Sequence, residues 1–276
     1  MSEIPALKPM RGFHATSEPL KGFQTTIKEA TVNNTKTLFE QDGHHWVAFR
    51  RGKTAQEAQT GTNGYLVVRE GRGMLLDPGR VDNFPVSMVS VSEAMKLEGM
   101  EILLATHYDP DVVASLSFWI KLCPQAKVHV PAISRQLLTL FCAPEKIEEI
   151  PDGGVDFSLG GTPMQLIPAH YCHSPVNFSL FDPLARVLYS GNIGSVEQVN
   201  TTPESVFLKD FDRYRVQLEN FHTRWLPSNR AKNKWVRQVR ALDPEMICPI
   251  MGQIITRKDI PRFLNWLEEL EVGLAA

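Results

Sequence analysis

The feature that most limits the fold is a series of short β-rich segments between residues 147 and 192. Five of them follow one another, separated by Gly, Pro and Asp: EEIP, GGVDFSLG, TPMQLIPAH, VNFSLFDP and RVLYSGN. Such spacing is typical of neighbouring strands joined by tight turns. Parallel neighbours need crossover connections of about a dozen residues or more, so a doubly wound parallel sheet fits poorly. We expect these segments to form one continuous sheet.

A second β-rich region precedes this series and contains TKTLFEQ, HHWVAFRR and GYLVVREGRGMLLDPG, the last a hairpin with Glu-Gly-Arg-Gly between its strands. Apolar residues recur at helical spacing over 86–98, 112–123 and 132–141, with strands at EILLATH and KVHVP between them. Residues 203–242 are predicted to be mostly helical, MICPI a strand, and KDIPRFLNWLEELEV a final amphipathic helix. Two β-rich halves that each carry helices predict an α/β (α+β) fold, a four-layered αββα sandwich.

Composition excludes several classes of protein. The chain has 276 residues, of which 43% are hydrophobic and 22% charged, with a formal net charge of −2. No basic excess indicates nucleic acid, and no run reaches the roughly 20 apolar residues of a membrane helix. The N-terminus lacks the apolar region of a signal peptide. We therefore expect a cytoplasmic protein with neither a nucleic-acid nor a membrane partner.

Domain organisation and cysteine spacing are also informative. Residues 1–35 are polar and without sustained periodicity, which predicts an N-terminal extension, and 36–276 are expected to form one domain. The four cysteines have no CxxC spacing, so free, buried thiols are expected.

The segment ILLATHYDPD leaves an apolar run and at once presents His107, Asp109 and Asp111. Side chains at alternate residues point the same way on an extended chain, and they can converge in a loop. Carboxylates held together repel one another unless a cation lies between them. The pattern therefore suggests a metal site or a basic partner, and the alternative is a loop in which an aspartate caps the next helix.

A second motif, PAHYCHSPVNFS, places His170 and His173 in a loop between two predicted strands. Two histidines and one carboxylate form the ligand set of a facial iron site, and a further carboxylate allows a larger cluster. Tyr108 and Cys172 flank these positions and could donate hydrogen bonds to a bound oxygen species. Simple burial in the core is the alternative for both residues.

Several ordered motifs together resemble the metallo-β-lactamase-fold family. More narrowly, they resemble its flavodiiron-related branch, the stand-alone oxygen-binding diiron proteins that lack a flavodoxin domain. The motifs are LLDPG, THYDPDVVASL, PAHYCHSPVNFSLFDPLARVLYSGNIGS, WLPSN, CPIMGQII and RFLNWLEEL, and the similarity spans about residues 36 to 272. The resemblance implies an αββα sandwich with metal ions at the ends of the sheets.

The resemblance also implies a set of ligands. His107, Asp109 and Asp111 match the family's His-x-Asp/Glu-x-Asp ligands, and His173, directly before Ser-Pro, matches the next. His170 falls on a family histidine whose role is not fixed. The first metal position would then use His107, Asp109 and His173, and the second would use Asp111.

Two ligand positions depart from the family. Asn192 stands where the aspartate that bridges both irons is expected, and Met251 where the last histidine ligand is expected. A neutral amide cannot replace carboxylate charge between cations that lie about 3.5–4 Å apart, and a thioether is a soft ligand for ferric iron. One metal ion is therefore favoured over two, with a weak two-metal site and a metal-free fold as alternatives.

These observations predict a non-haem iron protein that binds, senses or reduces dioxygen or a related small oxidant. Iron is the expected cofactor, as one or two ions, with zinc as the alternative. Turnover as a flavodiiron-like oxidoreductase would need an external reductase, whereas sensing would need a signalling partner. The alternatives are a metal-poor pseudo-enzyme that binds a ligand or partner, and a zinc-dependent hydrolase. Against the hydrolase, Val112 stands where such enzymes typically place a histidine. The sequence leaves a homo-oligomer open.

Overall fold

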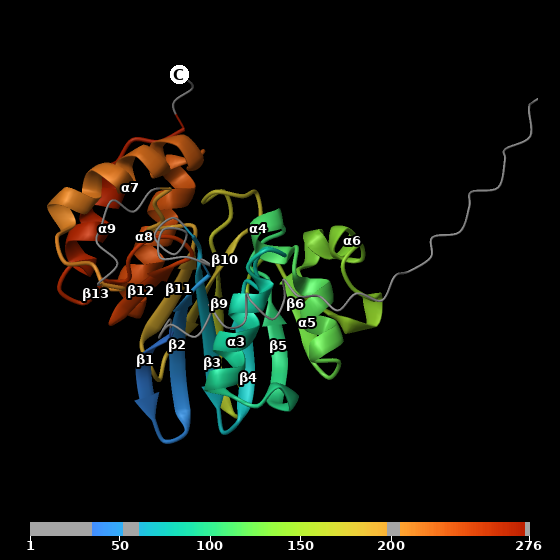
Figure 1. The fold of residues 1–276 in the computed structure, drawn as a ribbon. Coiled ribbons are helices and arrows are strands. Elements are labelled where there is room, and N and C mark those ends of the chain that lie inside the picture. The colour runs from blue at the N-terminus through green and yellow to red at the C-terminus, as the bar shows by residue number, and fades with distance from the viewer. Residues whose placement is uncertain (1–34, 52–60, 198–204, 274–276) are drawn as a thin grey trace, which may run out of the picture.

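Two sheets lie face to face in the computed structural model, which describes residues 35–51, 61–197 and 205–273 (Figure 1). In the first sheet β1 to β4 are antiparallel neighbours, and β4 to β7 are parallel ones. Its strands lie in chain order: β1 (Thr35–Gln41), β2 (His44–Arg50), β3 (Asn63–Arg69), β4 (Arg72–Leu76), β5 (Met100–Leu104), β6 (Lys127–Pro131) and β7 (Ile147–Ile150).

The second sheet is antiparallel except for one parallel pair, β11 with β12. Its spatial order is β13 (Ile255–Thr256), β12 (Met246–Pro249), β11 (Val187–Gly191), β10 (Phe178–Asp182), β9 (Thr162–Pro168) and β8 (Val155–Leu159). The two-residue strand β13 was not expected from the sequence.

The helices form two groups. The first comprises α3 (Phe84–Ala94), α4 (Pro110–Val113), α5 (Leu116–Leu122) and α6 (Arg135–Leu138), and the second α7 (Phe211–Trp225), α8 (Asn229–Leu242) and α9 (Ile260–Glu269). Figure 1 shows α7, α8 and α9 on one side of the strands and α5 and α6 on the other. Within the described residues, no helix is long and apolar enough to cross a membrane.

Two hydrophobic cores fill the space between these layers, and the first of them lies between the sheets and continues under α3, α5 and α6. Along β10 and β11, Leu180 and Tyr189 belong to the core between the sheets, whereas their neighbours Phe181 and Leu188 belong to the core under α7, α8 and α9. Successive side chains of a strand point to opposite faces, so an apolar strand can serve both cores at once. The predicted αββα sandwich is confirmed.

The prediction of one continuous sheet over 147–192 is wrong for its first strand. β7 pairs in parallel with β6, at the edge of the first sheet, and only β8 to β11 lie in the second. The link between β6 and β7 passes through α6, and a crossover of this kind returns the chain to the sheet that it left. The series of neighbouring strands joined by tight turns therefore begins with β8 and not with β7.

Smaller differences concern turns and helix length. The β3–β4 loop is only Glu70-Gly71, whose φ angles of 50° and 79° fit a type I′ turn. The helix expected over 112–123 is divided into α4 and α5. The segment 132–141, also expected to be a helix, begins with a short 3-10 turn and forms an α-helix only in α6. The predicted N-terminal extension, apart from Thr35, lies outside the described residues.

Candidate metal site

Asp109 occupies the N-cap position of α4 without capping it. Its backbone carbonyl accepts from the amides of Val112 and Val113, but its side chain makes no capping hydrogen bond. Capping normally uses the carboxylate of such an aspartate. The Asp109 carboxylate is therefore free to face elsewhere, and the helix-capping alternative does not hold for its side chain.

His107 is oriented by a chain of hydrogen bonds that ends on a buried carboxylate. Its Nδ1 lies 3.0 Å from the hydroxyl oxygen of Thr106, and that hydroxyl donates to Asp77 at 2.9 Å. Asp77 also accepts from the Thr106 amide at 2.8 Å and from the Tyr189 hydroxyl at 2.6 Å. Because the single hydroxyl proton of Thr106 goes to Asp77, the Nδ1–H of His107 donates to Thr106. In the neutral ring Nε2 then carries the lone pair, which accepts from Nδ2 of Asn192 at 3.2 Å and is the form of donor that binds metals.

His173 comes from the loop between β9 and β10 and has a φ of 105°, which is unusual for a residue other than glycine. Its ring stacks on Phe221 at a centroid distance of 6.1 Å and lies 5.1 Å from that of Trp225. Among the described residues, its buried Nδ1 has no hydrogen-bond partner. Metal-binding histidines usually donate the proton of the nitrogen that does not bind the metal to an acceptor. In His173 the packing against Phe221 and Trp225 orients the ring instead.

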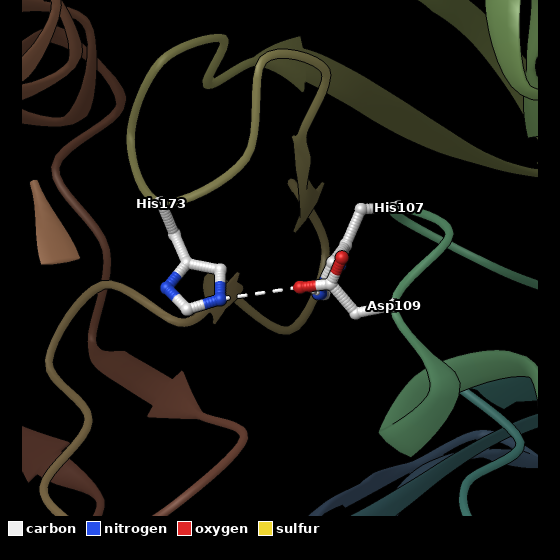
Figure 2. A group of neighbouring side chains, drawn as sticks. All are labelled: His107, Asp109 and His173. Carbon is white, nitrogen blue, oxygen red and sulfur yellow. Dashed lines mark hydrogen bonds and ion pairs between the residues drawn. The ribbon is translucent and has the colours of Figure 1, made fainter. Parts of the chain in front are cut away.

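The three side chains converge on one point. Asp109 Oδ2 lies 3.4 Å from Nε2 of His107 and 3.2 Å from Nε2 of His173. Figure 2 shows His107 and Asp109 on one segment and the ring of His173 directed at them from another loop. Two donors each about 2.1 Å from one ion lie roughly 3.0–3.4 Å apart for angles between octahedral and tetrahedral. These three groups could therefore hold one metal ion.

The charges of the site favour an anion at Asp109. Hydrogen bonds from His107 and then from His173 hold the pKa of Asp109 well below its usual range. Burial lowers the pKa of His107, but the hydrogen bond to Asp109 and the charges of Asp77, Asp109 and Asp111 outweigh burial, so that this pKa is raised. A metal ion would replace the proton that His107 otherwise attracts.

The residues predicted for a second metal are arranged less favourably. Asp111 lies outside the group of mutually close donors formed by the other three side chains, and burial raises its pKa. Asn192 is buried and its Nδ2 lies 3.2 Å from Nε2 of His107, so its amide reaches the first position. Met251 forms an isolated bridge with Thr62, and its amide donates to Ser195. One carboxylate, an amide and a thioether would be a poor set of donors for iron.

For three other residues singled out from the sequence, the structure shows hydrogen bonding, burial or core packing. Both ring nitrogens of His170 are engaged, because Nε2 donates to the Asp152 carbonyl at 2.8 Å and Nδ1 accepts from the Asn177 amide at 3.3 Å. Cys172 is buried, and desolvation raises the pKa of its thiol to about 12. Tyr108 packs partly buried against the core between the sheets. The cysteines are all free and buried, as expected.

His222 of α7 anchors the loop that carries Asn192. Its Nε2 accepts from the Gly194 amide at 3.0 Å, and its Nδ1 donates to the Leu218 carbonyl at 2.7 Å. The ring is fully buried, and desolvation lowers its pKa to about 4. The folded protein therefore requires a neutral imidazole here.

This arrangement predicts a component of acid destabilisation that depends on His222. A pKa lowered from its unfolded value near 6.5 contributes stability that is present above that value and is lost as the pH falls toward 4. Over this window we expect the parent to lose about 3 kcal/mol more unfolding free energy than a His222→Gln variant. Urea unfolding at a series of pH values measures this difference. His45→Gln, which makes the same replacement at a half-buried position of β2, is the matched control, and a parental slope in His222→Gln would contradict the assignment.

Several residues that build the site were missed from the sequence. Asp77 and Thr106 are not ligands but orient one, and Tyr189 reaches them from the opposite sheet. Phe221 and Trp225 lie far along the chain from the histidine that they contact. Only Asp77 left a local signal, as the polar residue of LLDPG at the end of an apolar strand.

Comparison with known protein families identifies one that matches most of the chain. The family described as ODP family beta lactamase matches residues 60–252, a segment that contains every residue of the candidate site. No curated protein sequence matches the chain.

Solved structures give closely similar folds. The structure of a peroxy diiron species of the chemotaxis sensor ODP is 32% identical, with a TM-score of 0.77 over 87% of this chain and 96% of that one. The apo state of the chemotaxis sensor ODP from T. denticola is also 32% identical, with a TM-score of 0.76 over 87% and 95%. Rubredoxin oxygen:oxidoreductase from Desulfovibrio gigas is only 17% identical, with a TM-score of 0.71 over 85% and 61%, and shares the fold.

Proposed function

The chain belongs to the ODP beta-lactamase family, and on that premise we propose that it is a non-haem iron protein that senses dioxygen or a related small oxidant. The iron would be held at one position by His107, Asp109 and His173. Asp111, Asn192 and Met251 would leave a second position poorly provided with ligands.

The observation that carries this proposal is the convergence on Asp109. Its carboxylate leaves the N-terminus of α4 uncapped and instead lies within 3.4 Å of two imidazole nitrogens from different loops. A loop built only for stability would be expected to use this carboxylate as a cap. Two imidazoles and one carboxylate with coordination positions left open are the ligand set of non-haem ferrous proteins.

The groups around the ligands fit this role. The hydrogen bonds that link His107 through Thr106 to Asp77 orient Nε2 as a metal donor. Packing against Phe221 and Trp225 restricts the ring of His173. When bound, ferrous iron supplies an affinity for dioxygen that amino-acid side chains lack. The protein itself supplies the orientation of the donors and the negative charge of Asp109.

Sensing is favoured over turnover by two observations. A chemotaxis sensor is among the similar proteins at 32% identity, whereas rubredoxin oxygen:oxidoreductase is only 17% identical. In addition, all four cysteines are free, separate and buried, so they offer no cluster for electron transfer. Sensing needs a signalling partner but no continuous supply of electrons. A flavodiiron-like oxidoreductase activity, with an external reductase, is the second candidate.

Metal analysis of protein purified without oxygen tests the proposal. We expect about one iron per chain, and an absorption spectrum that changes when dioxygen is admitted. A His170→Ala variant is the matched control, because its imidazole lies in the same loop as His173 but has both nitrogens engaged. It should retain the iron and the spectral change.

Other results would replace the proposal. One zinc ion per chain, with no response to dioxygen, would favour a zinc-dependent hydrolase. A metal-free protein, after reconstitution with excess ferrous iron, would favour the pseudo-enzyme that binds a ligand or partner. Steady consumption of dioxygen with a reductase and an electron donor would favour the oxidoreductase.

A further inference from the structure

Arg51, the residue that follows β2, is fully buried next to the backbone of Asp77, whose carboxylate is linked to His107 through Thr106. Its Nη2 donates to the backbone carbonyls of Leu76 at 3.1 Å and Asp77 at 2.5 Å. Within the described part of the chain, its Nε and Nη1 have no hydrogen-bond partner. A buried, incompletely paired guanidinium costs several kcal/mol in desolvation, so an ordinary structural role explains it poorly.

The guanidinium is packed against the loop that supports α4. A Cβ atom added to Gly79, whose φ is 97°, would lie 3.0 Å from Nη1 and 3.2 Å from Cζ of Arg51. A side chain at Gly79 would therefore exclude the guanidinium from its place. Gly79 donates to the Val112 carbonyl at 2.8 Å and accepts from the Ser115 amide at 2.9 Å. The charge of Arg51 is thus held against the segment that presents Asp109 and Asp111.

Negative charge lies near this position. Asp77, Asp109 and Asp111 all act on the ring of His107, and we call these three carboxylates the acidic cluster. Burial lowers the pKa of Arg51, while Tyr189, Asp77 and Asp111 act to raise it. Arginine remains protonated in proteins, so two members of the acidic cluster, Asp77 and Asp111, lie near a permanent cation.

We propose that the Arg51 guanidinium serves as the second cation of this site and takes over the charge balance that a second metal ion would provide. The inference rests on the proposed one-metal function and extends it to the second position. One divalent ion and one guanidinium carry three positive charges, which match the three carboxylates of the acidic cluster. A second divalent ion would exceed that negative charge, because Asn192 is neutral where a bridging carboxylate is expected.

The test measures binding of a second ion in the Asn192→Asp/Met251→His background, which restores the missing donors. Anaerobic titration with ferrous iron gives the two binding steps separately. Arg51→Gln removes the charge but keeps an amide that can donate to the Leu76 and Asp77 carbonyls. We expect it to tighten the second step at least about tenfold, because a repelling charge has been removed. Arg51→Met should have the same effect, so a folding defect in one of the two does not prevent the test.

Two control variants distinguish the effect of the Arg51 charge from a general disturbance of the structure. Arg51→Lys retains the positive charge and should leave the second step unchanged. Lys232→Met removes the other fully buried cation of the described chain, which lies in α8 and donates to carbonyls of α9, and it should also leave that step unchanged. An unchanged or weaker second step in both Arg51→Gln and Arg51→Met would overturn the inference.

The first binding step reports independently on the proposed function. If the parent binds one iron and Arg51→Gln leaves the second step of the restored variant unchanged, the Arg51 inference fails and the proposed function stands. If the parent binds no iron, the proposed function fails, and the inference about Arg51 fails with it.

Discussion

Replacing His107 with alanine is expected to remove iron binding almost completely. His107 is the most buried of the three proposed ligands, and its Nε2 has been directed to the metal position by Thr106 and Asp77. Loss of groups that merely orient a ligand costs about 10–100-fold in metal affinity, so loss of the ligand should cost more than about 100-fold. His173→Ala should have a comparable effect, since it leaves one imidazole and one carboxylate.

Ferrous titration monitored by calorimetry, with elemental analysis of the dialysed protein, measures this loss. Circular dichroism checks that each variant remains folded. Asp111→Ala should reduce binding less, because Asp111 lies outside the group of mutually close donors. Equal metal retention in His107→Ala, His173→Ala and Asp111→Ala would show that the ion, if any, is held elsewhere.

Restoring the two altered positions together is expected to raise iron occupancy from about one toward two ions per chain. Asn192→Asp adds one negative charge between the two positions, and Met251→His adds an imidazole in place of a thioether. Imidazole is better matched to iron than thioether sulfur, and a bridging carboxylate offsets the repulsion between two cations. Because Asn192 already lies 3.2 Å from His107, the new carboxylate would start within reach of the first metal position.

Anaerobic reconstitution with excess ferrous iron, followed by metal analysis, tests this second prediction. A matched control pairs Asn192→Asp with Met251→Leu, which leaves an apolar side chain that has no donor atom, and it should remain near one ion per chain. Recovery short of two ions still supports the prediction, since drift in surrounding groups commonly changes affinity about 10–100-fold. A restored variant with no more metal than the parent would indicate that the pocket serves ligand or partner binding.

The two predictions concern residues that differ in how readily the sequence identified them. His107, Asp109 and His173 belong to short motifs at the ends of apolar segments, so their chemistry could be inferred before the fold was known. Asn192 and Met251 were identified only as departures from a resemblance. Nothing in the local pattern of SGNIG or IMGQII indicates that either residue lies near a metal.

The layered fold was also predictable, because strand and helix periodicities are local properties of the chain. Short β-rich runs broken by Gly, Pro and Asp identified β8 to β11, and the tight turns between them favoured neighbouring strands over a doubly wound sheet. The sheet to which β7 belongs could not be read in the same way. An edge strand with two buried isoleucines fits either sheet, and the choice depends on the crossover through α6.

The sequence by itself determined the classes of secondary structure and the candidate metal donors, because each depends on residue type and short spacing, whereas the shortage of ligands at a second position was inferred from the family resemblance. Only the tertiary structure decided how those donors are used. Asp109 leaves α4 uncapped because two histidines attract its carboxylate, one of them from a loop after β9. Arg51 and Tyr189 act on Asp77 from different sheets. Such contacts join distant parts of the chain through packing, and no local pattern specifies them.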